Sequence, residues 1–369
     1  MEFAYIITLA AFLVCFLAAL VGLRLAASEL SSPVPGSSWR CDAFLPVLLV
    51  SFAAFVLLFA FANRTYDQIF PLTWVDLLLA FVSAAAVYAV SLFKKTGRFA
   101  LPALAGAVLL CTAFLPADFM LFQNHLPFWG DRFCIVLLWT LFAWCFRYMN
   151  GIDGIASLQA SGFVCGLLIL SVLGGLPLLY GNFAAALLGA LTALLVYNWY
   201  PAKLLLKDGA CVSLGFLLGW LTILTAREGT GSCALIYAMY YILEICWAVG
   251  RKLIANDGSL VSNTLYYRLN ASGLSPAEIG QNVAKLLTVL LVLGSFQVYA
   301  PNNYSLPLAA ALVALWFMSK LNNWQEPQQS LKDINREVIR DIKDNVEDIK
   351  NHAVGRHRHT PHTVALVED

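Results

Sequence analysis

Apolar segments long enough to cross a membrane recur along most of the chain and constrain its fold more than any other feature. Of its 369 residues, 60% are hydrophobic and 12% are charged, whereas a soluble domain has about 25% charged residues. About 20 apolar residues in a helix cross the ~30 Å core of a bilayer. We therefore predict an all-α, polytopic membrane helix bundle of about eleven transmembrane helices. The predicted spans are residues 4–24, 43–62, 72–93, 101–119, 132–149, 155–177, 180–199, 210–226, 233–250, 280–300 and 303–321.

Basic residues beside these spans predict the orientation of the bundle. With the N-terminus outside, the inner loops hold 13 Lys and Arg residues before the tail, and the outer loops hold three. The positive-inside rule then places the N-terminus outside and the C-terminus in the cytoplasm. The formal net charge is +1, so nucleic acid is not an expected partner. The nine cysteines contain no Cys-x-x-Cys or zinc spacing, and we assign them no chemistry.

The sequence after the last span differs in character, and it divides the chain into residues 1–321, 322–352 and 353–369. The middle part predicts a cytoplasmic amphipathic helix, because its apolar residues recur every 3.6 positions on average. Residues 331–351 carry five basic and six acidic side chains, which disfavours a membrane-surface helix. Docking onto the chain's own cytoplasmic face, onto another copy or onto a partner protein fits better, and a solvated helix is the alternative. The last part, which contains three histidines and directly follows His352, predicts a disordered tail, with metal binding as the alternative.

Two polar segments interrupt the apolar pattern on the predicted cytoplasmic side. The first, "RYMNGIDGIA" at 147–156, predicts a turn with positive φ at Asn150-Gly151, followed by a helix that Asp153 caps. The second begins at Asn198 and reaches Asp208, which Lys203 and Lys207 flank. A carboxylate beside two cations at the mouth of a bundle suits Mg²⁺ next to phosphates.

These segments resemble the signatures of a known family, the polyprenyl-phosphate N-acetylhexosamine 1-phosphate transferases, which include MraY, WecA and WbpL-like enzymes. The signature N-x-x-N-x-x-D-G-x-D-G-[IL]-A aligns with residues 144–156, and N-W-P-P-A-K-x-F-M-G-D-x-G-S-x-x-L-G aligns with 198–215. A third element, L-Y-x-R-L-x-x-x-G-L-S, aligns with 265–275, and the Pro-x-Pro of the first cytoplasmic loop is Pro33 and Pro35. The resemblance implies the MraY/WecA-like fold in a bacterial plasma membrane.

The resemblance also implies a reaction and its site. Such enzymes use Mg²⁺ to move a sugar phosphate from a UDP-sugar onto undecaprenyl phosphate, and they release UMP. The implied partners are therefore a polyprenyl phosphate lipid and a UDP-sugar, with a homodimer as the implied assembly. The implied catalytic residues are Asp153 and Asp208, with Asp208 at the metal. The implied substrate-binding residues are Asn150, Asn198, Lys203, Lys94, Lys95 and Arg98.

The departures from the family pattern concentrate on the groups that do chemistry. The first Asp of the signature is Asn150, and its two asparagines are Trp144 and Arg147. The loop at 91–98, where the family has an acidic pair, contains no carboxylate, and the expected histidines are Val261 and Thr264. Joining two phosphates needs cations and a positioned acid or base, and each lost group costs about 10²–10⁴ in rate.

Three hypotheses follow from these losses. The favoured one is a catalytically degenerate member, a pseudoenzyme that binds a lipid phosphate or nucleotide, or serves as a scaffold. The alternative is an active Mg²⁺-dependent glycosyl-1-phosphate transferase of cell-envelope polysaccharide synthesis. A transporter on the same scaffold would need polar residues buried within the spans, and the sequence offers few. Ser275 to Glu278 form a capping-box pattern, which predicts that the last cytoplasmic loop still enters its helix in order.

Overall fold

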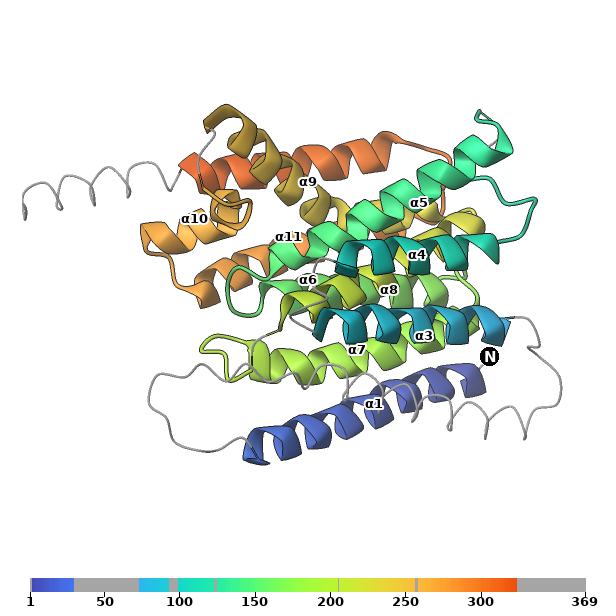
Figure 1. Cartoon of the computed structure of the whole chain (residues 1–369), viewed down its shortest axis with the longest axis horizontal. Helices are drawn as coiled ribbons and strands as arrows, with labels where there is room; N and C mark the ends of the chain where they lie inside the picture. The colour runs from blue at the N-terminus through green and yellow to red at the C-terminus, as the bar shows by residue number, and fades with distance from the viewer. Residues whose placement is uncertain are drawn as a thin grey trace, which may run out of the picture. The chain divides into compact units, whose positions relative to one another are not determined.

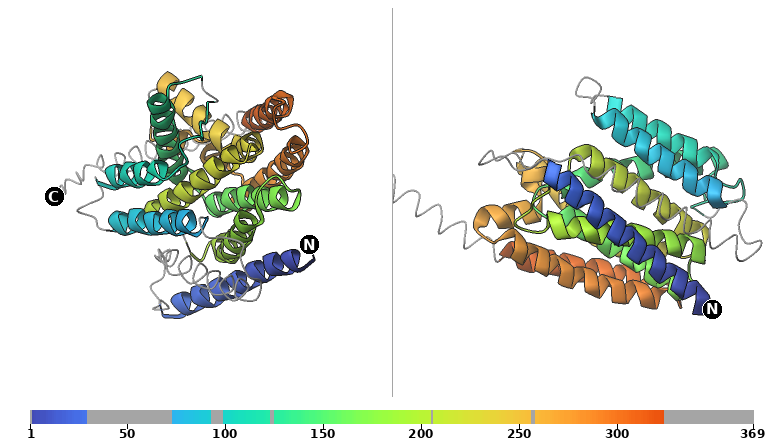
Figure 2. Two further views of the ribbon diagram at one scale, coloured as in Figure 1. Left: turned by 90° about the vertical axis from the view of Figure 1, so that its right-hand side faces the viewer. Right: turned by 90° about the horizontal axis from the view of Figure 1, so that it is seen from below.

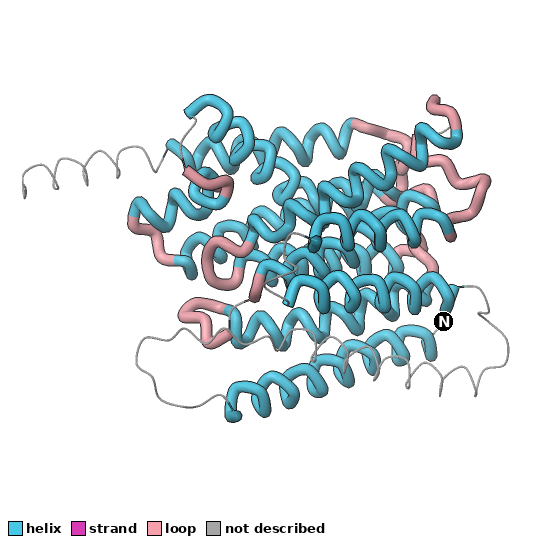
Figure 3. The backbone as a smooth tube through the Cα atoms, viewed as in Figure 1, coloured by secondary structure: helices cyan, strands magenta, loops and turns pink. Residues whose placement is uncertain are grey.

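The computed structural model describes residues 2–29, 73–92, 99–122, 125–204, 206–255 and 258–323, and within these ranges every regular element is a helix (Figures 1 and 3). The predicted span 43–62, the loop with Lys94, Lys95 and Arg98, and the predicted tail helix lie outside the described residues. The longer helices are α1 (Glu2–Glu29), α3 (Thr73–Leu92), α4 (Ala100–Ala113), α5 (Phe128–Cys145), α6 (Ile155–Val172), α7 (Leu178–Asn198), α8 (Asp208–Arg227), α9 (Gly231–Ala255) and α11 (Pro276–Gln297). Shorter ones are η2 (Phe146–Met149), η3 (Val261–Asn263) and α10 (Leu265–Ser272), and a further helix covers Ser305–Asn323.

The prediction of a polytopic membrane helix bundle is confirmed. Eight described helices are long and apolar enough to cross a membrane, and two shorter apolar helices cover Leu78–Ser91 and Ala100–Ala113. A helix therefore accompanies each predicted span that lies in the described part of the chain. The sixth and seventh spans are separate helices, because α6 ends at Val172 and the chain turns through Gly174, with φ of 81°, before Leu178.

Helix α8 lies at the centre of the bundle and is the most buried of the described spans. Within its apolar window, 83% of the residues are buried, against 28% for α1. Helix α8 packs against α3, α5, α6 and α9, whereas α1 packs on α7 at the edge of the bundle (Figure 2). A Cβ atom on Gly189 of α7 would lie 2.4 Å from the Phe12 carbonyl oxygen of α1. Glycine therefore permits the close approach of these two helices.

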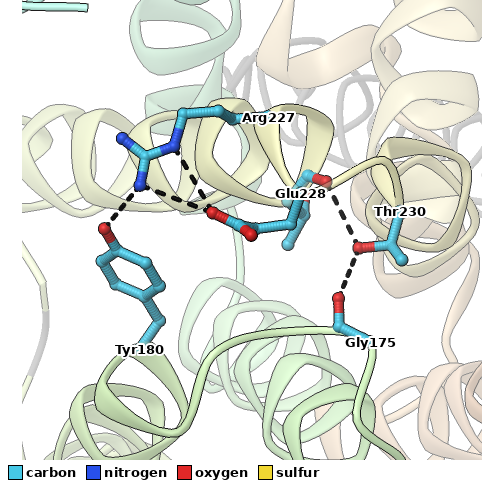
Figure 4. Close-up of polar contacts among 6 residues, drawn as sticks. Gly175, Tyr180, Arg227, Glu228 and Thr230 are labelled. Atoms are coloured by element: carbon cyan, nitrogen blue, oxygen red, sulfur yellow. Dashed lines mark hydrogen bonds and ion pairs between the residues drawn. The ribbon is translucent and has the colours of Figure 1, made fainter. Parts of the chain in front are cut away.

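Polar contacts close the end of the bundle at which α8 passes into α9. The Arg227 guanidinium donates to the Tyr180 hydroxyl at 2.8 Å and pairs with the Glu228 carboxylate at 3.4 Å (Figure 4). The Thr230 hydroxyl donates to the Gly175 carbonyl at 2.8 Å. These contacts join the turn between α8 and α9 to the turn between α6 and α7. At this end of the bundle, the Glu228 carboxylate neutralises the Arg227 guanidinium.

The chain forms two compact units, Met1–Met318 and Ser319–Asp369. The first holds all the helices from α1 to α11. Of the second, the structure describes only residues 319–323, which belong to the helix Ser305–Asn323. The division of the chain at residues 321 and 352 stays a prediction.

Candidate functional site

The three segments that resemble family signatures lie at one end of the bundle, which we call the signature end. They are the connection from α5 to α6, the connection from α7 to α8, and the connection from α9 through α10 to α11 (left in Figures 1 and 3). Successive helices run in opposite directions, so alternate connections meet at the same end. The end closed by Arg227 and Glu228 is the opposite one, because α8 begins at Asp208 after the second signature segment and ends at Arg227.

Two side chains of the first segment fasten it to the second. The Asn150 amide nitrogen donates to the Leu206 carbonyl at 2.5 Å, and the Ala202 backbone N–H donates to the Asp153 carboxylate at 3.1 Å. Both contacts join residues far apart in sequence, and both use backbone groups of the connection between α7 and α8. Asn150 and Asp153 are therefore engaged in holding two loops together.

The predicted local roles of this turn are wrong. Asp153 does not cap α6, because the N-cap position belongs to Gly154 and has no side-chain cap. Positive φ occurs at Gly154, at 80°, whereas Asn150 has φ of −92°. The Asp153 carboxylate bonds across to Ala202 instead. Glycine allows the left-handed backbone that brings position 154 close to Asn198 and Trp199.

Asn198 is buried, with 2% of its surface exposed, and both atoms of its amide are used. Its nitrogen donates to the Leu204 carbonyl at 2.8 Å, and its oxygen accepts from the Ser157 hydroxyl at 2.7 Å. The side chain thus ties the end of α7 to the loop that follows and to the first turn of α6. A buried amide with both atoms satisfied is a structural connector.

The third segment joins the first through Tyr266 on α10. The Tyr266 hydroxyl donates to the Tyr148 carbonyl, and burial raises the pKa of this hydroxyl above its usual value. The hydroxyl therefore stays protonated and remains a donor. The ring lies against Gly151, where a Cβ atom would come 2.8 Å from Cε2 of Tyr266 and 2.9 Å from Cγ1 of Val261. The signature turn and α10 are consequently in direct contact.

Thr264 and the helix start at Ser275 complete this segment. Thr264, at a position where the family pattern has a histidine, is fully buried, and its hydroxyl donates to the Val261 carbonyl at 2.6 Å. The predicted capping box is confirmed, because Ser275 and Glu278 exchange hydrogen bonds at the start of α11. The loop before α11 therefore keeps an ordered helix start, although the expected histidines are absent from positions 261 and 264.

Glu244 of α9 is a buried acid that belongs to none of the sequence motifs. Its side chain is 0% exposed, and its Oε1 atom accepts from the backbone N–H groups of Leu265 at 2.6 Å and Tyr266 at 3.4 Å. Its Oε2 atom has no hydrogen-bond partner among the residues that the structure describes. Glu244 therefore holds the start of α10 from within the bundle. The sequence signal was a single acid in the predicted span 233–250.

Asp208 differs from these buried and half-buried residues in its exposure. It is the first residue of α8, and its side chain is exposed, as are those of Lys203 and Lys207. No group of three His, Cys, Asp or Glu residues in the described part of the chain is arranged to hold a metal ion. The structure thus places Asp208 at the surface, whereas Asp153 is half-buried and bonded to Ala202.

The fold and these contacts define a class: a multi-pass membrane protein whose signature loops pack together at one end of a helix bundle. Residues 89–226 match the family model "Glycosyl transferase family 4". The match includes the first two signature segments and ends before the third.

Curated relatives agree with this match. The chain is similar to phospho-N-acetylmuramoyl-pentapeptide-transferases of Prochlorococcus marinus (28% identity over 153 residues, 39% of this chain and 42% of the relative) and Chlamydia pneumoniae (30% over 167 residues, 43% and 44%). A third relative with this name, from Campylobacter lari, is 30% identical over 162 residues, 37% of this chain and 45% of its own length. The matches span less than half the length of these relatives. They confirm the predicted resemblance to the polyprenyl-phosphate hexosamine 1-phosphate transferases.

Proposed function

We propose that this protein keeps the membrane scaffold of a sugar-1-phosphate transferase and binds a polyprenyl phosphate or a nucleotide, but does not transfer the sugar phosphate. The signature end faces the cytoplasm in this proposal, in agreement with the 13 basic residues of the inner loops against three of the outer. The protein then acts as a lipid- or nucleotide-binding subunit, or as a scaffold for partner proteins.

One observation carries the proposal: the polar residues at these signature positions, whether retained or replaced, serve as internal connectors. Asn150, Asp153 and Asn198 each bond to a backbone group of the segment from 202 to 206. Catalysis of phosphoryl transfer needs groups that are aimed at the substrate and at the charge that develops in the transition state. Here Asn150, Asp153 and Asn198 hold two loops together, so their presence does not require activity.

The described residues do not fit a Mg²⁺ site of the kind that the family reaction uses. Mg²⁺ takes oxygen ligands in an octahedral shell, and in such enzymes it is held by carboxylates together with substrate phosphates. Asp208 offers one exposed carboxylate, and one oxygen of Asp153 already accepts from Ala202. Position 150 is an amide whose nitrogen bonds to Leu206. We therefore assign the metal no step.

The second candidate is an active Mg²⁺-dependent transferase, and the exposure of Asp208 favours it. A carboxylate at the first turn of α8, with Lys203 and Lys207 exposed nearby in sequence, is open to a metal ion and to phosphates. In this reading, UDP-sugar and polyprenyl phosphate give polyprenyl-diphosphate-sugar and UMP. Asp208 is then indispensable.

A transfer assay separates the two candidates. Purified protein in nanodiscs receives undecaprenyl phosphate, a panel of UDP-N-acetylhexosamines and Mg²⁺, with an active phospho-N-acetylmuramoyl-pentapeptide-transferase as positive control. We expect no lipid-linked sugar from the wild-type chain and unchanged thermal unfolding of Asp208→Asn. Mg²⁺-dependent turnover that Asp208→Asn abolishes would overturn the proposal and establish the second candidate.

The scaffold role has its own test in native membranes. Residues 331–351 carry apolar side chains at helical spacing together with five basic and six acidic residues, so we propose that they bind a partner protein or a second copy. Co-purification with mass spectrometry of proteins and lipids should recover a stoichiometric partner or a dimer, and deletion of 331–351 should release it. Recovery of lipid alone would leave the binding role and remove the scaffold role.

A further inference from the structure

Arg147 forms a cluster of its own at the signature end, with Trp144 and Tyr148. Its guanidinium carbon lies 4.3 Å from the centre of the Trp144 ring and 4.9 Å from that of the Tyr148 ring. One guanidinium nitrogen donates to the Tyr148 hydroxyl at 3.2 Å. All three side chains are half-buried. Two rings and a hydroxyl thus hold the planar cation, and such contacts orient an arginine at little entropic cost.

No carboxylate pairs with this guanidinium in the part of the chain that the structure describes. By contrast, Arg227 at the opposite end pairs with Glu228. A half-buried charge at the end of a span is costly unless it is compensated, so such residues commonly mark a place where an ion or a headgroup binds. Aromatic faces compensate part of that cost and leave most of the five N–H donors of the guanidinium available.

The position of the cluster indicates the chemistry of its ligand. Arg147 lies at the end of the span Phe128–Met149 and three residues before Asn150 of the signature turn. A residue near the end of a membrane span lies at the level of the lipid headgroups. A guanidinium held in one plane matches the geometry of phosphate oxygens, to which it donates two parallel hydrogen bonds.

The replacements at positions 144, 147 and 150 of the signature have a combined effect on the local charge. The family pattern has neutral asparagines at positions 144 and 147, where this chain has the ring and the cation that stack on each other. The same turn has an amide in place of a carboxylate at Asn150. The local charge has therefore become more positive, and a phosphate can be neutralised there by the protein itself.

We infer that Arg147, clamped by Trp144 and Tyr148, binds a phosphate monoester directly and without a divalent metal. This inference deepens the proposed function and rests on it, because it names the charge that holds the ligand. The phosphate monoester belongs either to a membrane lipid or to a nucleotide. The same chemistry serves both, so the experiment separates them.

The experiment measures binding in nanodiscs with EDTA, with polyprenyl monophosphate as the lipid probe and UMP as the soluble probe. We expect Arg147→Gln to weaken binding of one probe by about 10- to 100-fold, since the loss of a charge-assisted hydrogen bond has effects of this size. Arg147→Lys should restore only part of the affinity, because lysine lacks the planar fork. Trp144→Leu should weaken binding by about three- to tenfold.

The matched control is Arg251→Gln, which removes an arginine from the last turns of α9 at the same end. It should change the affinity by less than twofold. Equal losses in Arg147→Gln and Arg251→Gln would show general surface electrostatics and overturn the inference. Unchanged binding in Arg147→Gln, or wild-type binding only with Mg²⁺, would also overturn it while the proposed function stands. No wild-type binding of either probe under any condition would remove the ligand-binding role itself.

Discussion

The two ends of the bundle use different chemistry to fasten their loops. At the opposite end, Arg227 finds an acid from its own chain in Glu228 and a hydroxyl in Tyr180. At the signature end, Asn150 and Asp153 bond to backbone groups, and the cation Arg147 has aromatic partners instead of an acid.

At the opposite end an acid of the chain neutralises the arginine, whereas at the signature end the positive charge of Arg147 is not neutralised by a described acid. The Arg227–Glu228 pair is internally neutral, and its side chains are 20% and 30% exposed. The signature end is internally rigid, since its connectors are buried or half-buried, yet its half-buried Arg147 pairs with no acid among the described residues. A rigid frame with uncompensated positive charge is suited to an anionic ligand.

The largest effect should come from Glu244. Replacing it by leucine leaves the N–H groups of Leu265 and Tyr266 without their acceptor inside the bundle. A buried unpaired donor costs about 1–3 kcal/mol, so we expect Glu244→Leu to lower the free energy of unfolding by about 2–4 kcal/mol. Titration with SDS in detergent micelles, followed by circular dichroism, measures this loss.

Glu244→Gln is the control for that prediction. Its amide oxygen can accept from the same two N–H groups, so we expect a loss below about 1 kcal/mol. If leucine is tolerated as well as glutamine, Glu244 does not hold α10, and the signature end is less rigid than the contacts indicate.

Gly151→Ala should have the next largest effect. The new Cβ atom would lie 2.8 Å from the fully buried ring of Tyr266, and overpacking of this kind costs about 1–3 kcal/mol. The same stability measurement applies. Gly106→Ala is the matched control, because a Cβ atom there meets nothing within 4 Å, and alanine should stabilise α4 by up to about 1 kcal/mol. Equal effects of the two substitutions on stability would show that the turn at Gly151 does not pack tightly against Tyr266 of α10.

The smallest effect should come from the opposite end. Arg227→Ala removes a partly exposed ion pair and the hydrogen bond to Tyr180. Exposed pairs contribute about 0–1 kcal/mol, so we expect a loss below about 1 kcal/mol and no change in ligand binding. A loss larger than that of Glu244→Leu would reverse the contrast between the two ends.

The helix bundle could be predicted from the sequence because hydropathy alone specifies it. Each apolar run long enough to span the bilayer became a helix wherever the structure describes it. The start of α11 was also predictable, since Ser275, Pro276 and Glu278 form a local pattern. Local patterns suffice where the contacts are local.

The site was harder to predict because its contacts are not local. The motifs identified Asn150, Asp153 and Asn198, but their partners Leu206, Ala202 and Ser157 lie up to 56 residues away in sequence. Asp153 carries the usual signal of a helix cap and nevertheless bonds elsewhere. Glu244 gave only the signal of one acid in an apolar run, and its role depends on where α10 begins.

One measurement tests the central claim, that this end of the bundle binds a phosphate but does not carry out the transfer. Native mass spectrometry of the purified protein with polyprenyl monophosphate and UDP-N-acetylhexosamine, with EDTA or with Mg²⁺, follows the bound lipid and the product together. We predict that wild-type protein retains the monophosphate lipid or the nucleotide in EDTA and forms no lipid diphosphate sugar with Mg²⁺. Product that forms only with Mg²⁺ and disappears in Asp208→Asn would contradict the account.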